Sequence, residues 1–143
     1  MQHVENITKV YGLPCVVAIN RFPMDTEAEL KLIEDKCHEV GVNVALSEVW
    51  AKGGEGGEEL AKEVIRLCET ESDFHYCYET DTTIEEKLDA IVKKIYHGDG
   101  VVLTDAAKKQ AKRLTELGFG NYSICMAKTQ YSFSDNAKLL GAP

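Results

Sequence analysis

The sequence predicts an α/β fold with three layers, in which helices flank a mostly parallel sheet. The apolar run Val16–Ile19 is typical of a strand covered on both faces of a parallel sheet. It stops at a polar cluster that opens a helix, and the same order of strand, loop and helix recurs along the chain. Because strands that alternate with helices form layered parallel sheets, we expect a single α/β unit over residues 1–143.

The first half of the chain supplies two of these repeats. Thr26 and Glu29 form a T-x-x-E capping box that starts a helix, and Gly41 ends it. The predicted elements are a helix at Val4–Tyr11, a strand at Val16–Ile19, the capped helix, a strand within Asn43–Val49, and a helix with Leu60, Val64 and Leu67 on one face.

The second half repeats the pattern with shorter strands. Thr83 and Glu86 form a second capping box, and Thr104 is the N-cap of a later helix. The predicted elements are a strand at Phe74–Tyr78, a helix that ends near Gly98, a brief strand or extended link at Val101–Leu103, a helix after Thr104, and a strand at Tyr122–Lys128 before the polar loop Thr129–Asp135.

Charge and hydropathy limit the classes of function. The formal net charge of -8 argues against a surface that binds nucleic acid or an anionic membrane. No signal peptide and no apolar run long enough to span a bilayer is found in the sequence. These features predict a cytoplasmic protein.

The five cysteines and four histidines have no spacing typical of metal ligands, so we assign no metal to them. Cys15 and Cys125 lie in strand-like apolar runs, and Cys37 and Cys68 lie on apolar helix faces. We expect these thiols to be buried and reduced.

Candidate site residues follow the two best-defined strands. In open α/β sheets, ligands bind outside the carboxyl ends of the strands. Asn20 there can donate and accept hydrogen bonds, Arg21 is a cation, Phe22 offers an apolar face, and Pro23 stiffens the turn. If the strands are parallel, the second one delivers Trp50 and Lys52 to the same edge. On the residues alone, the favoured interpretation is instead that Trp50 is a core residue and Phe22 caps the sheet.

The glycine-rich segment Gly53–Gly57 before a helix has the form of an anion-binding nest. Glu55, Glu58 and Glu59 would repel a phosphate there. We therefore expect a flexible hinge or lid, in which the glycines permit positive φ angles.

Three segments of the chain closely resemble formate-tetrahydrofolate ligases. They are VVAINRFPMDTEAEL, WAKGGEGG and GFGNYSICMAKTQYSFSD, and the resemblance extends from about Val4 to Pro143. It implies a ligase of one-carbon metabolism that joins formate to tetrahydrofolate, with ATP and Mg²⁺ as cofactors, through formyl phosphate. It also implies that the fold is part of a larger P-loop-type α/β enzyme, and that the full-length enzyme is a homo-oligomer.

The resemblance assigns roles to individual residues. Phe22 and Trp50 match the aromatic positions that hold the folate ring, and Asn20 and Pro23 lie in the same motif. From charge and neighbourhood, we expect Arg21 beside the bound ligand and Lys52 near its glutamate tail. No residue is assigned to catalysis or to a metal.

The resemblance also suggests how the chain relates to the whole enzyme. The phosphate loop of the family lies upstream of these residues, and no G-x-x-x-x-G-K-[ST] occurs in them. We expect an internal piece of a longer enzyme, with ATP and Mg²⁺ held mainly elsewhere and regions of about 1–72 and 73–143 belonging to two subdomains. Such a piece would be inactive alone. The alternative is a nucleotide- or pterin-binding module without catalysis.

Overall fold

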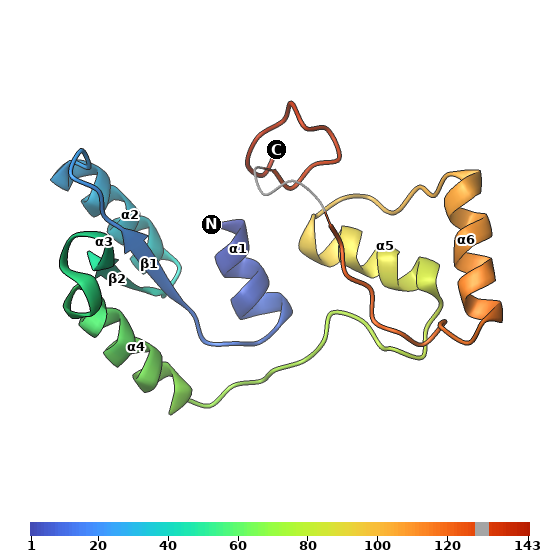
Figure 1. Ribbon diagram of the computed structural model, residues 1–143, viewed down its shortest axis with the longest axis horizontal. Helices are drawn as coiled ribbons and strands as arrows, with labels where there is room; N and C mark the ends of the chain where they lie inside the picture. Colours follow the sequence, from blue (N-terminus) through green and yellow to red (C-terminus); the bar gives the residue numbers. More distant parts are fainter. Residues whose placement is uncertain (128–131) are drawn as a thin grey trace. The chain divides into compact units, whose positions relative to one another are not determined.

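The computed structural model describes residues 1–127 and 132–143 of the chain. These residues form two compact units, Met1–Phe74 and His75–Pro143 (Figure 1).

The first unit contains the two strand-helix repeats that the sequence predicts. In order, its elements are α1 (Gln2–Glu5), a π-helical turn (Asn6–Val10), β1 (Val16–Asn20), α2 (Glu27–Glu39), β2 (Asn43–Ser47), α3 (Val49–Lys52), a 3-10 helix (Gly53–Gly57) and α4 (Glu58–Cys68). The capping box at the start of α2 is confirmed, because the Glu29 amide donates to the Thr26 hydroxyl and the Thr26 amide donates to the Glu29 carboxylate.

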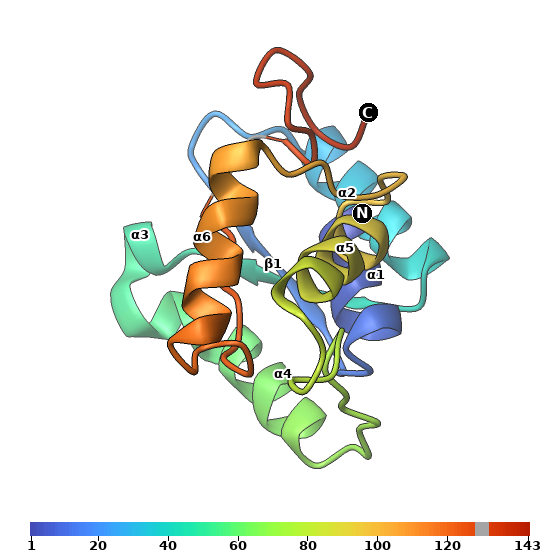
Figure 2. The same cartoon turned by 90° about the vertical axis from the view of Figure 1, so that its right-hand side faces the viewer.

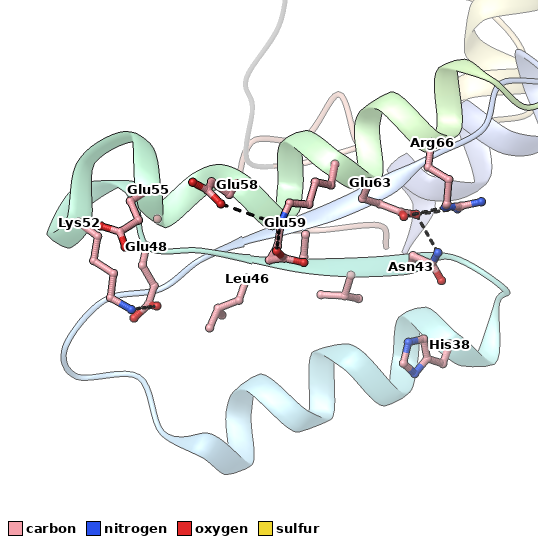
Figure 3. Close-up of a pocket in the computed structure, with 14 residues that line it drawn as sticks. His38, Asn43, Leu46, Glu48, Lys52, Glu55, Glu58, Glu59, Glu63 and Arg66 are labelled. Carbon is pink, nitrogen blue, oxygen red and sulfur yellow. Dashed lines mark hydrogen bonds and ion pairs between the residues drawn. The ribbon is translucent and has the colours of Figure 1, made fainter.

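β1 and β2 form a parallel pair, as predicted, with Val16 opposite Asn43 and Asn20 opposite Ser47. Figure 3 shows α4 on one side of the strands and α2 on the other, which confirms the α/β class and its order of layers. Ile19 and Ala45 are buried in this core together with Leu30 and Cys37 of α2. The expectation that β1 is covered on both faces is wrong, since Ala18 and Asn20 are exposed. Both helices pack mainly on β2.

The second unit is built on the helices α5 (Ile84–Ile95) and α6 (Asp105–Glu116). Both predicted caps are confirmed: Thr83 and Glu86 form a capping box, and the Thr104 hydroxyl accepts from the Ala107 amide. Figures 1 and 2 show that the two helices cross one another and do not lie parallel.

The strands predicted at Phe74–Tyr78 and Tyr122–Lys128 are wrong where the structure describes them, whereas Val101–Leu103 is an extended link, one of the two predicted alternatives. Residues 74–78, 101–103 and 122–127 are extended or bent but belong to no strand, and Lys128 lies outside the described residues. Buried backbone groups need hydrogen-bond partners, and here side chains provide several of them. The Tyr78 hydroxyl accepts from the Ile124 amide at 2.8 Å and donates to the Ile124 carbonyl at 3.3 Å. The carboxylate of Asp89 accepts from the Val101 amide.

Two lysines of α5 fix the chain in the same way. Lys87 is fully buried, and its ammonium group donates to the carbonyls of Gly120 and Tyr122 at 2.6 and 3.2 Å. Lys94 donates to the Cys77 carbonyl at 2.6 Å. The segments that were predicted as strands are therefore attached to α5 by side chains and not by a β-ladder.

The helices of residues 1–127 and 132–143 include none that is both long and apolar enough to cross a membrane.

The cysteines differ from the prediction in their exposure. Cys37 and Cys77 are buried and Cys15 is half-buried, whereas Cys68 and Cys125 are exposed. The expectation of burial is thus wrong for the last two. Cys68 is the final residue of α4, and Cys125 lies in an extended segment without a neighbouring strand. Burial, with the adjacent Cys37 adding to it, raises the pKa of the Cys15 thiol.

Brief alkylation of the native protein should modify Cys68 and Cys125 first and Cys37 and Cys77 last, because reaction requires an accessible thiolate. Mass spectrometry of peptides over a time course would measure the order. The same reaction in denaturant, where all five thiols should react at similar rates, is the control. Labelling of Cys37 as fast as that of Cys68 in the native protein would contradict the burial described above.

Candidate functional site

The carboxyl ends of β1 and β2 are joined by one hydrogen bond beyond the last residue pair. The Arg21 amide donates to the Ser47 carbonyl at 3.0 Å, directly after Asn20 and Ser47 pair in register. Phe22 follows this bond by one residue on the first strand, and Trp50 follows it by three residues on the second. The parallel register therefore brings the predicted aromatic residues to one edge of the sheet.

Phe22 and Trp50 contact one another at this edge. Their ring centroids are 6.1 Å apart and the ring planes are inclined by 58°, within the range of favourable aromatic pairs. Phe22 is 45% exposed and Trp50 is 64% exposed. Neither ring is buried, so the alternative interpretation of Trp50 as a core residue is wrong.

The turn that carries Phe22 is closed by Asp25, a residue that the sequence analysis did not select. The carboxylate of Asp25 accepts from the Phe22 amide at 2.7 Å, and the Asp25 amide donates to the Phe22 carbonyl at 3.0 Å. Pro23 is exposed in this turn. Pro23 at the second position of this four-residue turn is a known turn signal and could have identified the turn, though not the bond from Asp25.

The charged candidates at the edge are each paired with a carboxylate. Arg21, whose side chain is 31% exposed, forms an ion pair with Glu27. Lys52 forms one with Glu48 at 2.5 Å. The hydrogen bond from Lys52 lowers the pKa of Glu48, and the positive charge of Arg21 contributes to the shift. Glu48 thus lies within the electrostatic reach of both cations. Asn20, the last residue of β1, is exposed beside them.

A groove of about 770 Å³ runs along β2 between α2 and α4 (Figure 3). Glu48 and Lys52 lie at one end of it, and Glu63 and Arg66 lie at the other. Five glutamates line the groove against two lysines and one arginine. This excess of negative charge disfavours a phosphate group. The sequence led to the same expectation, because glutamates near Gly53–Gly57 would repel a phosphate.

Glu63 connects α4 to β2 at the far end of the groove. Its carboxylate accepts two hydrogen bonds from the Arg66 guanidinium, at 2.7 and 2.8 Å, and one from the Asn43 side chain at 2.7 Å. These bonds, that from Arg66 first, lower the pKa of Glu63 to about 2.

Within residues 1–127 and 132–143, no group of three or more His, Cys, Asp or Glu side chains could hold a metal ion. The described residues therefore do not fit a Mg²⁺ site.

A family model described as formate-tetrahydrofolate ligase matches residues 1–143. The chain belongs to this family. The match confirms the resemblance drawn from the three sequence segments, and it covers both compact units. Formate-tetrahydrofolate ligases are enzymes that use ATP and tetrahydrofolate, so the exposed aromatic pair lies in a chain whose family binds a flat bicyclic ring.

The ion pair between Glu63 and Arg66 predicts a pH dependence of stability. The folded pKa of Glu63 is lower than its unfolded value of about 4.5, so its stabilisation is complete above that pH and is lost as the pH falls towards 2. A Glu63→Gln variant lacks this titration. Its free energy of unfolding should fall less steeply between pH 4.5 and pH 2, as measured by urea unfolding at several pH values.

Arg66→Met is the matched control, because it removes the group with the largest effect on the Glu63 pKa. In this variant, too, the free energy of unfolding should fall less steeply with decreasing pH than in the wild type. The double variant should show the same pH dependence as Glu63→Gln alone. An equal decrease in the free energy of unfolding for the wild type and Glu63→Gln over this pH range would rule out this role of the pair.

Proposed function

We propose that this chain supplies the folate side and part of the nucleotide side of an ATP-dependent ligase that converts formate and tetrahydrofolate to 10-formyltetrahydrofolate. The observation that carries the proposal is the exposed pair of Phe22 and Trp50 at the carboxyl edge of β1 and β2. Exposed aromatic faces at this position of a parallel sheet are suited to a flat heterocycle.

The pterin would lie between the two rings after they separate. A ring stacked on both sides needs faces about 7 Å apart, because carbon atoms in contact are about 3.5 Å apart. At the present centroid distance of 6.1 Å and inclination of 58°, the two rings contact one another, and the space for the pterin between them is closed. Exposed side chains change rotamer readily, so opening requires only a rotation of one or both rings.

The polar residues at the edge would orient the bound folate. Asn20 can both donate to and accept from the edge of the heterocycle. Arg21 would lie beside the ligand, and Lys52 would bind the carboxylates of the glutamate tail. Both cations are now paired with carboxylates, so a ligand carboxylate would exchange with Glu27 or Glu48. Pro23 would limit the flexibility of the turn after Arg21.

In this proposal the chain contributes orientation, and the phosphate chemistry takes place on other residues of the enzyme. ATP phosphorylates formate, N10 of the folate attacks the formyl carbon, and phosphate leaves. Fixing the pterin holds N10 for this attack. The proposal further includes a cytoplasmic location and a homo-oligomeric enzyme.

In the complete enzyme, Phe22→Ala or Trp50→Ala should raise the KM for tetrahydrofolate about tenfold to a hundredfold, since a stacking face is worth roughly 1–3 kcal/mol. The KM for formate should change little. Because both rings are exposed, melting temperatures should stay close to that of the wild type, unlike the loss of about 3–5 kcal/mol for a buried aromatic residue.

Phe22→Tyr is the matched control, because it keeps the aromatic face and should have a smaller effect than Phe22→Ala. A large loss of folding stability with a normal KM for tetrahydrofolate would remove the pair from the folate site.

The purified 143-residue chain should release no phosphate from ATP when formate, tetrahydrofolate and Mg²⁺ are present. The physical reason is that its sequence has no phosphate-binding loop to hold the transferred group. A phosphate-release assay with the complete enzyme as the positive control measures this. ATP-dependent turnover by the chain would show that the phosphate site lies within these residues.

A further inference from the structure

The glycine-rich turn after Trp50 is packed closely against the backbone that precedes Trp50. The Glu48 amide donates to the Gly56 carbonyl at 2.9 Å. A Cβ atom on Gly56 would lie 2.5 Å from both the carbonyl carbon and the carbonyl oxygen of Glu48, and 2.8 Å from the Val49 nitrogen. Carbon atoms in normal contact are about 3.5–4.0 Å apart, so a side chain here requires the backbone to move by about 1 Å.

The peptide that Gly56 contacts is the start of the helical turn that holds Trp50. The Glu48 carbonyl accepts from the amides of Ala51 and Lys52, each at 2.9 Å, and these bonds close α3 around Trp50. Movement of this peptide would carry Trp50 with it. Trp50 has no burial that would hold it in place by itself, since it is 64% exposed.

The neighbouring glycines differ from Gly56 in their surroundings. A Cβ on Gly54 would meet nothing within 4 Å, and the backbone of Gly54 has no positive φ. A Cβ on Gly57 would meet only Cγ2 of Val49, a side-chain atom, at 3.0 Å. The Cβ of an alanine would therefore meet open space at position 54, a movable side chain at position 57 and rigid backbone at position 56.

We propose that Gly56 is a positioning residue for Trp50, which sets the location of the indole ring relative to Phe22 by packing on the peptide between Glu48 and Val49. The inference rests on the proposed function only for its effect on folate binding. In this role the segment Gly53–Gly57 is a fixed support for α3, in place of the hinge or lid that its glycines suggested.

The test compares Gly56→Ala with Gly54→Ala in the complete enzyme. Gly56→Ala should raise the KM for tetrahydrofolate about tenfold, within the hundredfold that a displacement of about 1 Å can produce. The value of kcat and the KM for formate should change less than twofold, because phosphate transfer is remote from this turn. Gly54→Ala should match the wild type in all three constants.

Fluorescence tests the position of Trp50 independently of folate. The difference spectrum against a Trp50→Phe variant isolates the emission of Trp50 from that of any other tryptophan. Gly56→Ala should shift this emission, and Gly54→Ala should not. A shifted emission with an unchanged KM for tetrahydrofolate would support the role of Gly56 and overturn the folate site.

Equal emission and equal KM values for Gly56→Ala and the wild type would overturn the inference. If Gly56→Ala does not fold, Gly57→Ala replaces it, because Val49 Cγ2 can move aside. Its Cβ would displace Val49, the residue before Trp50, so the emission of Trp50 should shift and the KM for tetrahydrofolate should rise by less than in Trp50→Ala. Wild-type values for Gly57→Ala in that case would also overturn the inference.

Discussion

The register of β1 against β2 is the constraint on which the candidate site depends. Five consecutive residue pairs and the additional bond from Arg21 to Ser47 fix where each strand ends. A shift of one residue would move every side chain of one strand to the opposite face. It would also change the distance along the chain from the last ladder bond to Phe22 or to Trp50. The placement of the aromatic pair therefore depends on this register.

Two local interactions then fix the backbone at Phe22 and at Trp50. On the first strand, Asp25 closes the turn after Phe22 through its carboxylate and its amide. On the second strand, the Glu48 peptide begins α3 and is covered by Gly56. The first interaction depends on the side chain of Asp25, and the second depends on the absence of a side chain at Gly56. In both, the aromatic residue is held through its backbone while its ring remains exposed.

The sequence predicts the first unit better than the second for a physical reason. The strands at β1 and β2 and the capping boxes at Thr26 and Thr83 are local signals, and each appears in the structure. A strand also needs a neighbour, which local patterns do not report. Residues 74–78 and 122–127 have strand-like composition, yet their backbone groups bind side chains: the Cys77 carbonyl binds Lys94, and Ile124 binds Tyr78. The proximity of Phe22 and Trp50 follows from the pattern, whereas Asp25 and Gly56 become apparent only in three dimensions.

In the second unit, extended segments are attached by a few side chains, most of them from α5, so the tolerance of this unit to substitution differs between positions. A β-ladder distributes its hydrogen bonds along a backbone, so most substitutions leave them intact. Here the bonds to Gly120, Tyr122, Ile124 and Val101 depend on Lys87, Tyr78 and Asp89. Replacing Lys87 by a shorter side chain would remove the bonds to Gly120 and Tyr122, and Tyr78→Phe would remove both bonds to Ile124, although each changes one side chain only. Sequence drift in this unit should thus be limited at a few polar positions more severely than at its apolar ones.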